Sequence, residues 1–224
     1  MSRVDAVIRV DAVIRVDAVG RVDAVILAGG RGARLGGVDK PALLLGASTL
    51  LDRAVAAVAP ASTVVVGPTR AALPADVRQV REDPPFAGPA AALAAGLGAL
   101  RRGRSASALT IVLAADLPAA ASAVRELLRR MGPGAPDADG WVATGPAARR
   151  QHLLAVYRTA VLTEACRRTA GERGTLVGAS MRGVTERMRL AEIPLPAELT
   201  ADIDTRDDLA AALARERNDH VVPA

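Results

Sequence analysis

Short apolar runs alternate with helical patterns along this chain, and that alternation constrains the fold more than any other feature of the sequence. The runs lie at 24–27, 63–66 and 109–114, and each is bounded by Gly, Pro or Asp, as buried parallel strands usually are. Such an order predicts an α/β fold built on a single doubly wound, mostly parallel sheet. From apolar residues at helical spacing, helices are predicted at 49–58, 89–100, 120–130, 162–169 and 206–215.

The pattern becomes less regular after the third run. Glycine, alanine and proline crowd residues 131–140, which predicts a loop, and residues 141–157 are expected to return as strands beside the sheet. Ligands of open α/β sheets bind where the carboxyl ends of the strands meet. The glycine-rich segment after the first run, Asp83 and Asp116 are all expected at that edge.

Composition favours a single globular domain with a small-molecule ligand. The chain has 224 residues, of which 50% are apolar, so it is long enough to bury a core of its own. Its only aromatic residues are Phe86, Trp141 and Tyr157, too few for the stacking platforms of single-strand binders. The net charge is +5, but the arginines are scattered and form no run longer than two, which favours an anionic ligand over nucleic acid.

Targeting signals are not recognised in the sequence. It has no apolar run of membrane-spanning length and no signal-peptide pattern, so no membrane partner is expected. The single cysteine, Cys166, fits a reducing compartment and is expected to be a buried thiol. We therefore expect a cytoplasmic protein.

A hexamer is repeated at the N-terminus, in copies that begin at Arg3, Arg9, Arg15 and Arg21. Six is a multiple of the strand period of two but not of 3.6, so the repeat keeps one apolar face only as a strand. The last copy supplies the one strand that the fold needs. Residues 1–20 are expected to be a dispensable extension, 21–217 the folded domain and 218–224 a tail.

The glycine-rich segment from Gly29 to Gly37 ends beside Lys40, the only lysine of the chain. Glycines let backbone amides approach a polyphosphate closely, while Lys40, Arg31 and Arg34 can supply charge. The Walker pattern does not fit because Lys40 precedes proline, and the dinucleotide pattern lacks its third glycine. A plain turn between strand and helix is the alternative that the glycines alone do not exclude.

Several short motifs follow one another between about residue 22 and residue 213. They are the segment from Leu27 to Leu44, Glu82-Asp83, Ala87 to Ala91 with Gly96, Ala115 to Pro118, His152 to Tyr157 and Asp202 to Leu209. In this order they resemble the motifs of the MobA-like nucleotidyltransferases with a Rossmann-like fold, and the resemblance is closest to the molybdenum cofactor guanylyltransferase branch.

The resemblance implies a role for several of these residues. It implies that Leu27, Ala28, Gly29 and Gly30 hold the nucleotide, with Asp83 assisting. Lys40 and Arg34 would contact the phosphates and serve catalysis together with Asp116. That aspartate would also bind the nucleotide and Mg²⁺, the implied cofactor, and Asp204 would be a second metal ligand. The residues with implied roles are Leu27, Ala28, Gly29, Gly30, Arg34, Lys40, Asp83, Asp116 and Asp204.

The two proposed metal ligands each have a structural alternative. An aspartate at the end of an apolar run is well placed to hold a hard cation, but Asp116 could instead cap the following helix. Thr205 and Asp208 have the spacing of a capping box, so the segment around Asp204 could simply start a helix. Gly67 stands where relatives have an asparagine that assists nucleotide binding, which leaves the base contact open.

Three smaller features are also open. His152 and Tyr157 would line the acceptor pocket by resemblance, or be structural. Arg149 and Arg150 could meet an acidic acceptor or lie on a solvated surface. Asp39 is expected to orient Arg34 or Lys40.

The implied reaction is Mg²⁺-dependent transfer of GMP from GTP to molybdopterin with release of pyrophosphate. Two alternatives stay open. Asp202 and Asp204 replace asparagines of the guanylyltransferase branch, which favours CTP or another phosphorylated acceptor. A protein that binds a nucleotide without turnover is the third hypothesis, although Lys40 and Asp116 argue against it.

Overall fold

The computed structural model describes residues 22–30, 36–102, 107–131 and 137–219. The first three copies of the N-terminal repeat, Arg31 and Arg34 therefore lie outside the described residues, and the expectations placed on them stay predictions. From Val22 onwards the last copy forms the expected strand, β1 (Val22–Leu27). Within the described ranges the chain forms the expected α/β architecture.

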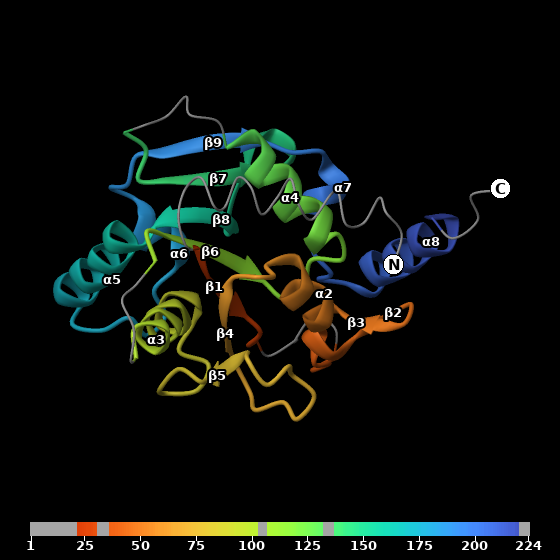
Figure 1. The fold of residues 1–224 in the computed structure, drawn as a ribbon, viewed down its shortest axis with the longest axis horizontal. Coiled ribbons are helices and arrows are strands. Elements are labelled where there is room, and N and C mark those ends of the chain that lie inside the picture. The colour runs from red at the N-terminus through yellow and green to blue at the C-terminus, as the bar shows by residue number, and fades with distance from the viewer. Residues whose placement is uncertain (1–21, 31–35, 103–106, 132–136, 220–224) are drawn as a thin grey trace.

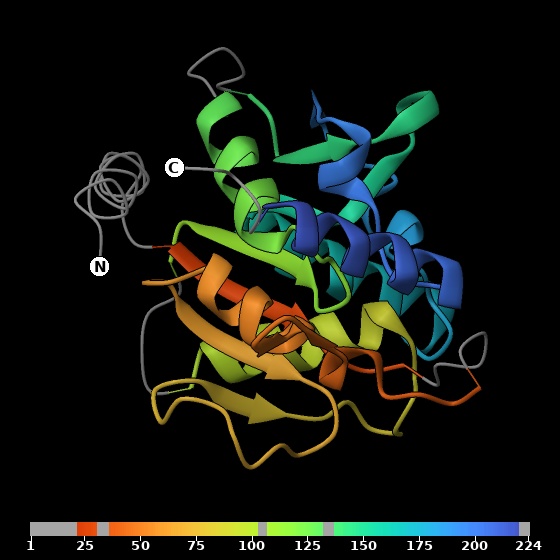
Figure 2. The ribbon, with the colours of Figure 1, turned by 90° about the vertical axis from the view of Figure 1, so that its right-hand side faces the viewer.

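A seven-stranded sheet lies at the centre of the described part of the chain, in the order β5-β4-β1-β6-β8-β7-β9. The arrows of β1, β4, β5 and β6 point the same way in Figure 2, and each neighbouring pair among them is parallel. Strand β8 runs against both of its neighbours, while β7 pairs with β9 in parallel. The sheet is thus mostly parallel, as the sequence predicted. Its strands are β1 (Val22–Leu27), β4 (Ser62–Val66), β5 (Arg78–Val80), β6 (Leu109–Ala114), β7 (Gly140–Thr144), β8 (Arg150–Arg158) and β9 (Leu190–Pro194).

Helices cover both faces of the sheet, so the fold is doubly wound. Figure 1 shows α3 and α5 on one side and α2 and α4 on the other. The two sides bury separate apolar clusters, one against α2 and α4 and one against α3, α5 and α6. These helices are α2 (Leu50–Ala57), α3 (Pro89–Leu100), α4 (Ala120–Arg130), α5 (Thr159–Arg173) and α6 (Met181–Thr185), and a short α7 (Ala197–Thr200) follows β9.

Helix α3 shows how closely the core is packed. A Cβ atom at Gly96 would lie 2.6 Å from a methyl carbon of Val25 in β1, so only glycine lets the helix approach the strand this closely. Small residues therefore take the place of the large aromatic side chains that the composition lacks. Of the three aromatic residues, Tyr157 and Trp141 are buried and Phe86 is exposed.

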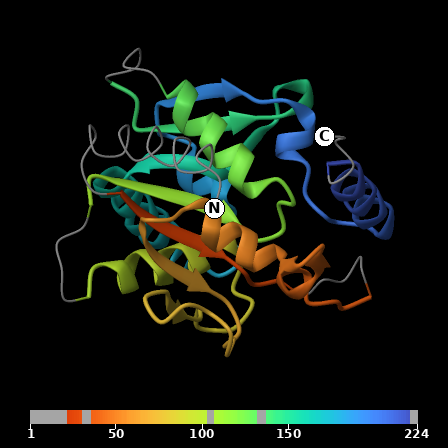
Figure 3. The same cartoon turned by 45° about the vertical axis from the view of Figure 1, so that its right-hand side comes forward.

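The last helix, α8 (Arg206–Asp219), lies apart from the sheet. Figure 3 shows it beside the small hairpin of β2 (Leu44–Leu45) and β3 (Ser48–Thr49). A third apolar cluster joins these parts through Leu45, Leu50, Ile203 and Ala212. Arg53 of α2 also forms an ion pair with Glu216 of α8. The C-terminal segment is thereby fixed next to η2 (Lys40–Ala42), the single helical turn that carries the lysine.

Candidate functional site

The carboxyl ends of four parallel strands form the edge at which the sequence predicted a site. The hydrogen-bond ladder continues past the strands: the amide of Ala28 donates to Val66 (2.8 Å) and that of Ala115 to Leu27 (3.0 Å). Gly67 continues it in the same way with Val80 (2.9 Å). The segments after β1, β4 and β6 are therefore held beside one another and beside the end of β5. Lys40 follows β1 and Asp116 follows β6, whereas Asp204 reaches this edge from the segment before α8.

Lys40 meets the predicted acidic residues at this edge. Its Nζ lies 2.5 Å from Oδ1 of Asp204 and 3.8 Å from Oδ2 of Asp116. The lysine side chain is only 16% exposed, so these contacts are shielded from water and are stronger than surface pairs. Asp204 and Lys40 are 164 positions apart in the sequence, and the docking of α8 beside η2 brings them together.

A third carboxylate joins them. One oxygen each from Asp116, Asp202 and Asp204 lies within 4.8 Å of the others. Three carboxylate oxygens at this spacing suit a hard divalent cation such as Mg²⁺. The residues present therefore fit the metal that the sequence led us to expect.

Electrostatics at Asp116 reflect this crowding. Burial raises the pKa of its carboxyl group to about 6, Lys40 opposes the rise, and Asp202 and Asp204 add to it. The cation nearby is thus too weak to offset burial and like-charge repulsion. A second positive charge nearby would therefore stabilise the ionised form of the Asp116 carboxyl group.

The segment around Asp204 serves two purposes. Asp208 accepts hydrogen bonds from the Thr205 amide (2.7 Å) and from its hydroxyl (2.7 Å), and the Asp208 amide donates back to that hydroxyl (3.2 Å). The capping box predicted from the sequence is therefore present. The same carboxylate accepts from the Asp204 amide (3.1 Å), and the Ile203 amide donates to the Asp116 carbonyl (3.1 Å). The helix start thus also fixes the aspartates.

The helix-cap alternative for Asp116 is not what the structure shows. Helix α4 begins at Ala120 with Ala119 as its N-cap, and no side chain caps it. The carboxylate of Asp116 faces Lys40 instead.

The expected nucleotide-binding segment lies beside the cluster. Leu27 and Ala28 are buried, whereas Gly29 and Gly30 are exposed at the edge. A Cβ atom at Gly67 would lie 2.7 Å from the Ala28 carbonyl oxygen, and the φ of Gly67 is +156°. The glycine at the position where relatives have asparagine is thus required by close contact with the backbone of Ala28.

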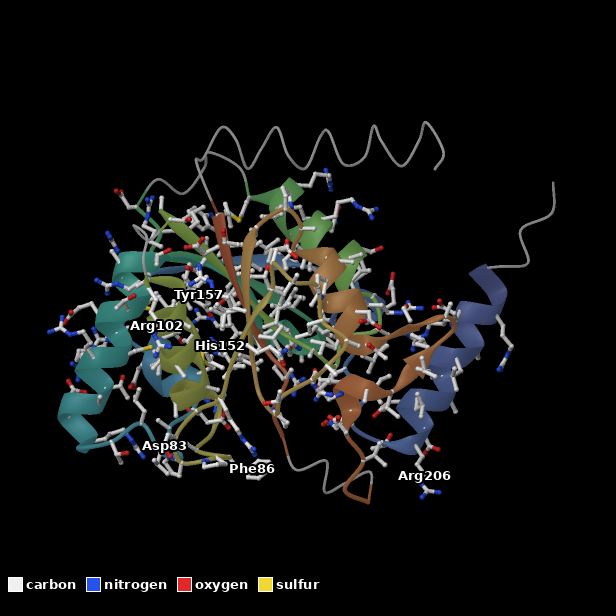
Figure 4. The ribbon with its side chains drawn as sticks, turned by 60° about the horizontal axis from the view of Figure 1, so that its bottom comes forward. Asp83, Phe86, Arg102, His152, Tyr157 and Arg206 are labelled. Atoms are coloured by element: carbon white, nitrogen blue, oxygen red, sulfur yellow. The ribbon has the colours of Figure 1, made fainter. Side chains whose placement is uncertain are left out.

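Two acidic neighbours after β5 differ in placement. Asp83, the predicted nucleotide ligand, is exposed, and Figure 4 shows it near Phe86 on the lower edge of the molecule. Glu82 is buried, and its Oε1 accepts the Phe86 amide (3.0 Å). That oxygen would lie 3.8 Å from a Cβ atom at Gly29, so Glu82 is the carboxylate of the pair that adjoins the glycine segment.

Asp39 pairs with a residue that the sequence did not single out. It was expected to orient Arg34 or Lys40, but both of its oxygens accept from Arg70, at 2.7 Å each. Arg70 lies in the turn after β4. The only signal that could have found it is that position, because turns after parallel strands share the ligand-binding edge.

His152 and Tyr157 form a separate group on β8, drawn close together in Figure 4. The Tyr157 hydroxyl donates to the His152 carbonyl (3.0 Å), and His152 Nδ1 lies 3.1 Å from the Thr185 hydroxyl. Burial, with Arg150 and Arg182 nearby, lowers the pKa of His152. Tyr157 is therefore structural, while half-buried His152 stays a candidate for the acceptor pocket. Arg150 pairs with exposed Glu192, as expected of a solvated surface.

The protein is thus a doubly wound α/β domain with a lysine and three carboxylates gathered at the carboxyl edge of its sheet. Residues 24–187 match the family of MobA-like NTP transferase domains, and the chain belongs to that family. It is accordingly a nucleotidyltransferase by family. No curated protein sequence matches it significantly.

Solved structures share the fold at low sequence identity. Molybdopterin-guanine dinucleotide biosynthesis protein A from Archaeoglobus fulgidus is 19% identical, with a TM-score of 0.61 over 88% of this chain and 99% of that one. The 2-C-methyl-D-erythritol 4-phosphate cytidylyltransferase from Thermus thermophilus is 21% identical, with a TM-score of 0.64 over 88% and 100%. The 4-diphosphocytidyl-2C-methyl-D-erythritol synthase from Anaerococcus prevotii is 13% identical, with a TM-score of 0.66 over 91% and 99%.

Proposed function

We propose that this protein is a Mg²⁺-dependent guanylyltransferase that transfers GMP from GTP to molybdopterin. The convergence of Lys40 with Asp116, Asp202 and Asp204 at the carboxyl edge of the sheet carries the proposal. A terminal phosphate of the acceptor attacks the α-phosphorus of GTP, the bond to the bridging oxygen of the β-phosphate breaks, and pyrophosphate leaves with the electron pair.

The chain's own part in this reaction is to position and neutralise charge, since the attacking phosphate is already an anion. Leu27, Ala28 and Gly29 hold the nucleoside with their backbone at the edge. Lys40 stabilises the charge that develops on the α-phosphate and the leaving group. Arg34 is proposed to assist it.

Asp116 and Asp204 are proposed to hold Mg²⁺, which supplies Lewis-acid neutralisation of phosphate oxygens when bound. Asp202 would add a third carboxylate. With Asp204 neutralised by a bound cation, Lys40 would be free to contact a phosphate oxygen instead of that carboxylate. Asp83, exposed beside the buried Glu82, is proposed to contact the nucleotide from the side of β5.

Cytidylyl transfer to another phosphorylated acceptor is the second candidate. The pair Asp202 and Asp204, and the structural likeness to a cytidylyltransferase, favour it. The chemistry at Lys40 and Asp116 would be the same, and only the base and the acceptor would differ.

Thermal unfolding of the purified protein with Mg²⁺ and each nucleoside triphosphate tests the base. A ligand that binds the folded state at 100 times its Kd stabilises it by about 2.7 kcal/mol. We expect GTP to give the largest rise in Tm, and pyrophosphate release on addition of molybdopterin. Protection by CTP alone would select the second candidate, and no protection by any triphosphate would contradict nucleotide transfer altogether.

The cytoplasm is the compartment we propose for this reaction. The buried free thiol of Cys166 is compatible with it. Among the described residues, none of the helices combines the length and apolar character needed to cross a bilayer. We also propose that residues 1–20 are dispensable for folding and turnover.

A further inference from the structure

One guanidinium joins the two ends of the glycine-rich segment. Arg70 donates through both terminal nitrogens to the carboxylate of Asp39, at 2.7 Å each. One of these nitrogens also lies 3.4 Å from the carbonyl oxygen of Ala28. Ala28 precedes the glycines and Asp39 follows them, so Arg70 fixes both of these residues relative to β4.

Arg70 is placed by the sheet and not by Asp39. Its amide donates to the side-chain oxygen of Gln79 (2.8 Å), and the Gln79 side-chain nitrogen donates back to its carbonyl (2.8 Å). Gln79 belongs to β5, which pairs with β4. The Arg70 side chain is only 14% exposed, so Asp39 pairs with a largely desolvated cation whose backbone is fixed by β5.

Asp39 in turn determines the position of the next residue, Lys40, at the start of η2. Asp39 is the N-cap of η2, but its side chain makes no capping hydrogen bond, and both of its oxygens accept from Arg70 instead. A fork-to-fork pair of this kind fixes direction as well as distance, which a lysine in place of the arginine cannot do. The position of Lys40, one residue further, depends on that direction.

We propose that Arg70 is a positioning residue that acts through Asp39 to hold Lys40 in reach of the reacting phosphates. The inference rests on the proposed nucleotidyl transfer. It assigns no contact between Arg70 and the substrate. Its effect on turnover is therefore expected to pass entirely through Lys40.

The Arg70→Lys variant keeps the positive charge but removes the two parallel hydrogen bonds of the guanidinium to Asp39. We expect kcat to fall ten- to a hundredfold, with KM for the triphosphate changed less than fivefold and the far-UV circular dichroism unchanged. Asp39→Asn is expected to do the same. Arg78→Lys is the matched control, since Arg78 also donates to a backbone carbonyl, that of Ala99 (2.7 Å), from β5; it should change kcat less than twofold.

A double-mutant cycle separates positioning from general damage. If Arg70 acts through Lys40, the Arg70→Lys change should alter kcat of the Lys40→Ala enzyme less than twofold. Single-turnover rates provide the same cycle where steady-state turnover is too slow. The inference would be overturned if the fold reductions in kcat of the two single variants multiplied in the double variant. It would also be overturned if the Arg70→Lys variant kept the wild-type kcat. Absence of turnover in the wild type would count against the proposed function, not against this coupling alone.

Discussion

Asp39 and Lys40 are neighbours in the chain, yet they belong to two ionic clusters of opposite character. Asp39 and Arg70 form a one-to-one pair with two matched hydrogen bonds. Lys40 instead contacts Asp204 and Asp116, with Asp202 alongside them. Within the second cluster, burial raises the pKa of the Asp116 carboxyl group to about 6.

We interpret the Asp39–Arg70 pair as part of the scaffold and the cluster around Lys40 as the candidate site. A balanced pair has no need of a ligand, because each charge already has its partner. A cluster in which burial and repulsion outweigh the nearby cation is stabilised when a further cation arrives, and such imbalance is typical of functional sites. Changes to the second cluster should therefore alter turnover more than stability.

Lys40→Ala is the strongest test of this contrast. We expect kcat to fall by about a thousandfold or more, the range seen when a preorganised charge is removed from a transition state. The fold should persist, as circular dichroism would show. Lys40→Arg should be nearly as inactive, because a planar fork cannot replace a compact ammonium among phosphates. Retention of near-normal kcat in either variant would remove Lys40 from the chemistry.

Asp116→Asn should separate stability from activity. The folded-state pKa of about 6 lies above the ordinary value of 3.8 for this carboxyl group, so the stability linked to the protonated group is present below about pH 4 and is lost as pH rises through about 6. The asparagine side chain of the variant is neutral at every pH, so the variant does not lose this stability as the pH rises. At pH 7 to 8 in the absence of metal, we expect the Asp116→Asn variant to be more stable than the wild type by roughly 1–3 kcal/mol while turnover is lost.

Thermal unfolding at several pH values checks this expectation. The advantage of the variant should shrink towards pH 4, and Mg²⁺ should raise the Tm of the wild type but not that of the variant. A variant that is less stable than the wild type at pH 8 would show that Lys40 outweighs burial at this carboxylate.

The smallest expected effects come from a comparison of two capping boxes that have the same residue types, one at the start of α2 and one at the start of α8. Thr49 and Asp52 start α2, and Thr205 and Asp208 start α8. Replacing either threonine by alanine should destabilise the fold by about 1 kcal/mol. Only Thr205→Ala should also weaken Mg²⁺ binding, by a few fold, because Asp208 holds the Asp204 amide as well. Equal metal affinity in the two variants, measured by calorimetry, would show that the α8 box serves the helix alone.

Local signals made much of the fold predictable. Helices 89–100 and 120–130 were predicted with the observed bounds, since proline starts the first and apolar spacing marks the second. Strands β5 and β9 were missed. The first has three residues, all half-buried, and the second is an edge strand that ends in proline, so neither shows the apolar run of a central strand.

The site was predictable where the sequence marks a strand end or a motif. Asp116 follows the apolar run of β6, and Asp204 precedes a capping box. Arg70 could not be predicted, because its role depends on a glutamine of another strand and on an aspartate 31 positions away. The contrast between Glu82 and Asp83 also needed coordinates, since only the direction of each side chain distinguishes them.

Gly67 has a consequence for redesign of this protein. The asparagine of its relatives cannot be restored there by a single exchange, because even the first side-chain carbon would collide with the Ala28 carbonyl oxygen at 2.7 Å. Replacing the whole turn after β4 by that of a relative would have to move Ala28. It would thereby also move the Ala28 carbonyl oxygen, which accepts a hydrogen bond from Arg70. If the proposed nucleotide site is correct, engineering of base preference would therefore have to begin on the segment after β5.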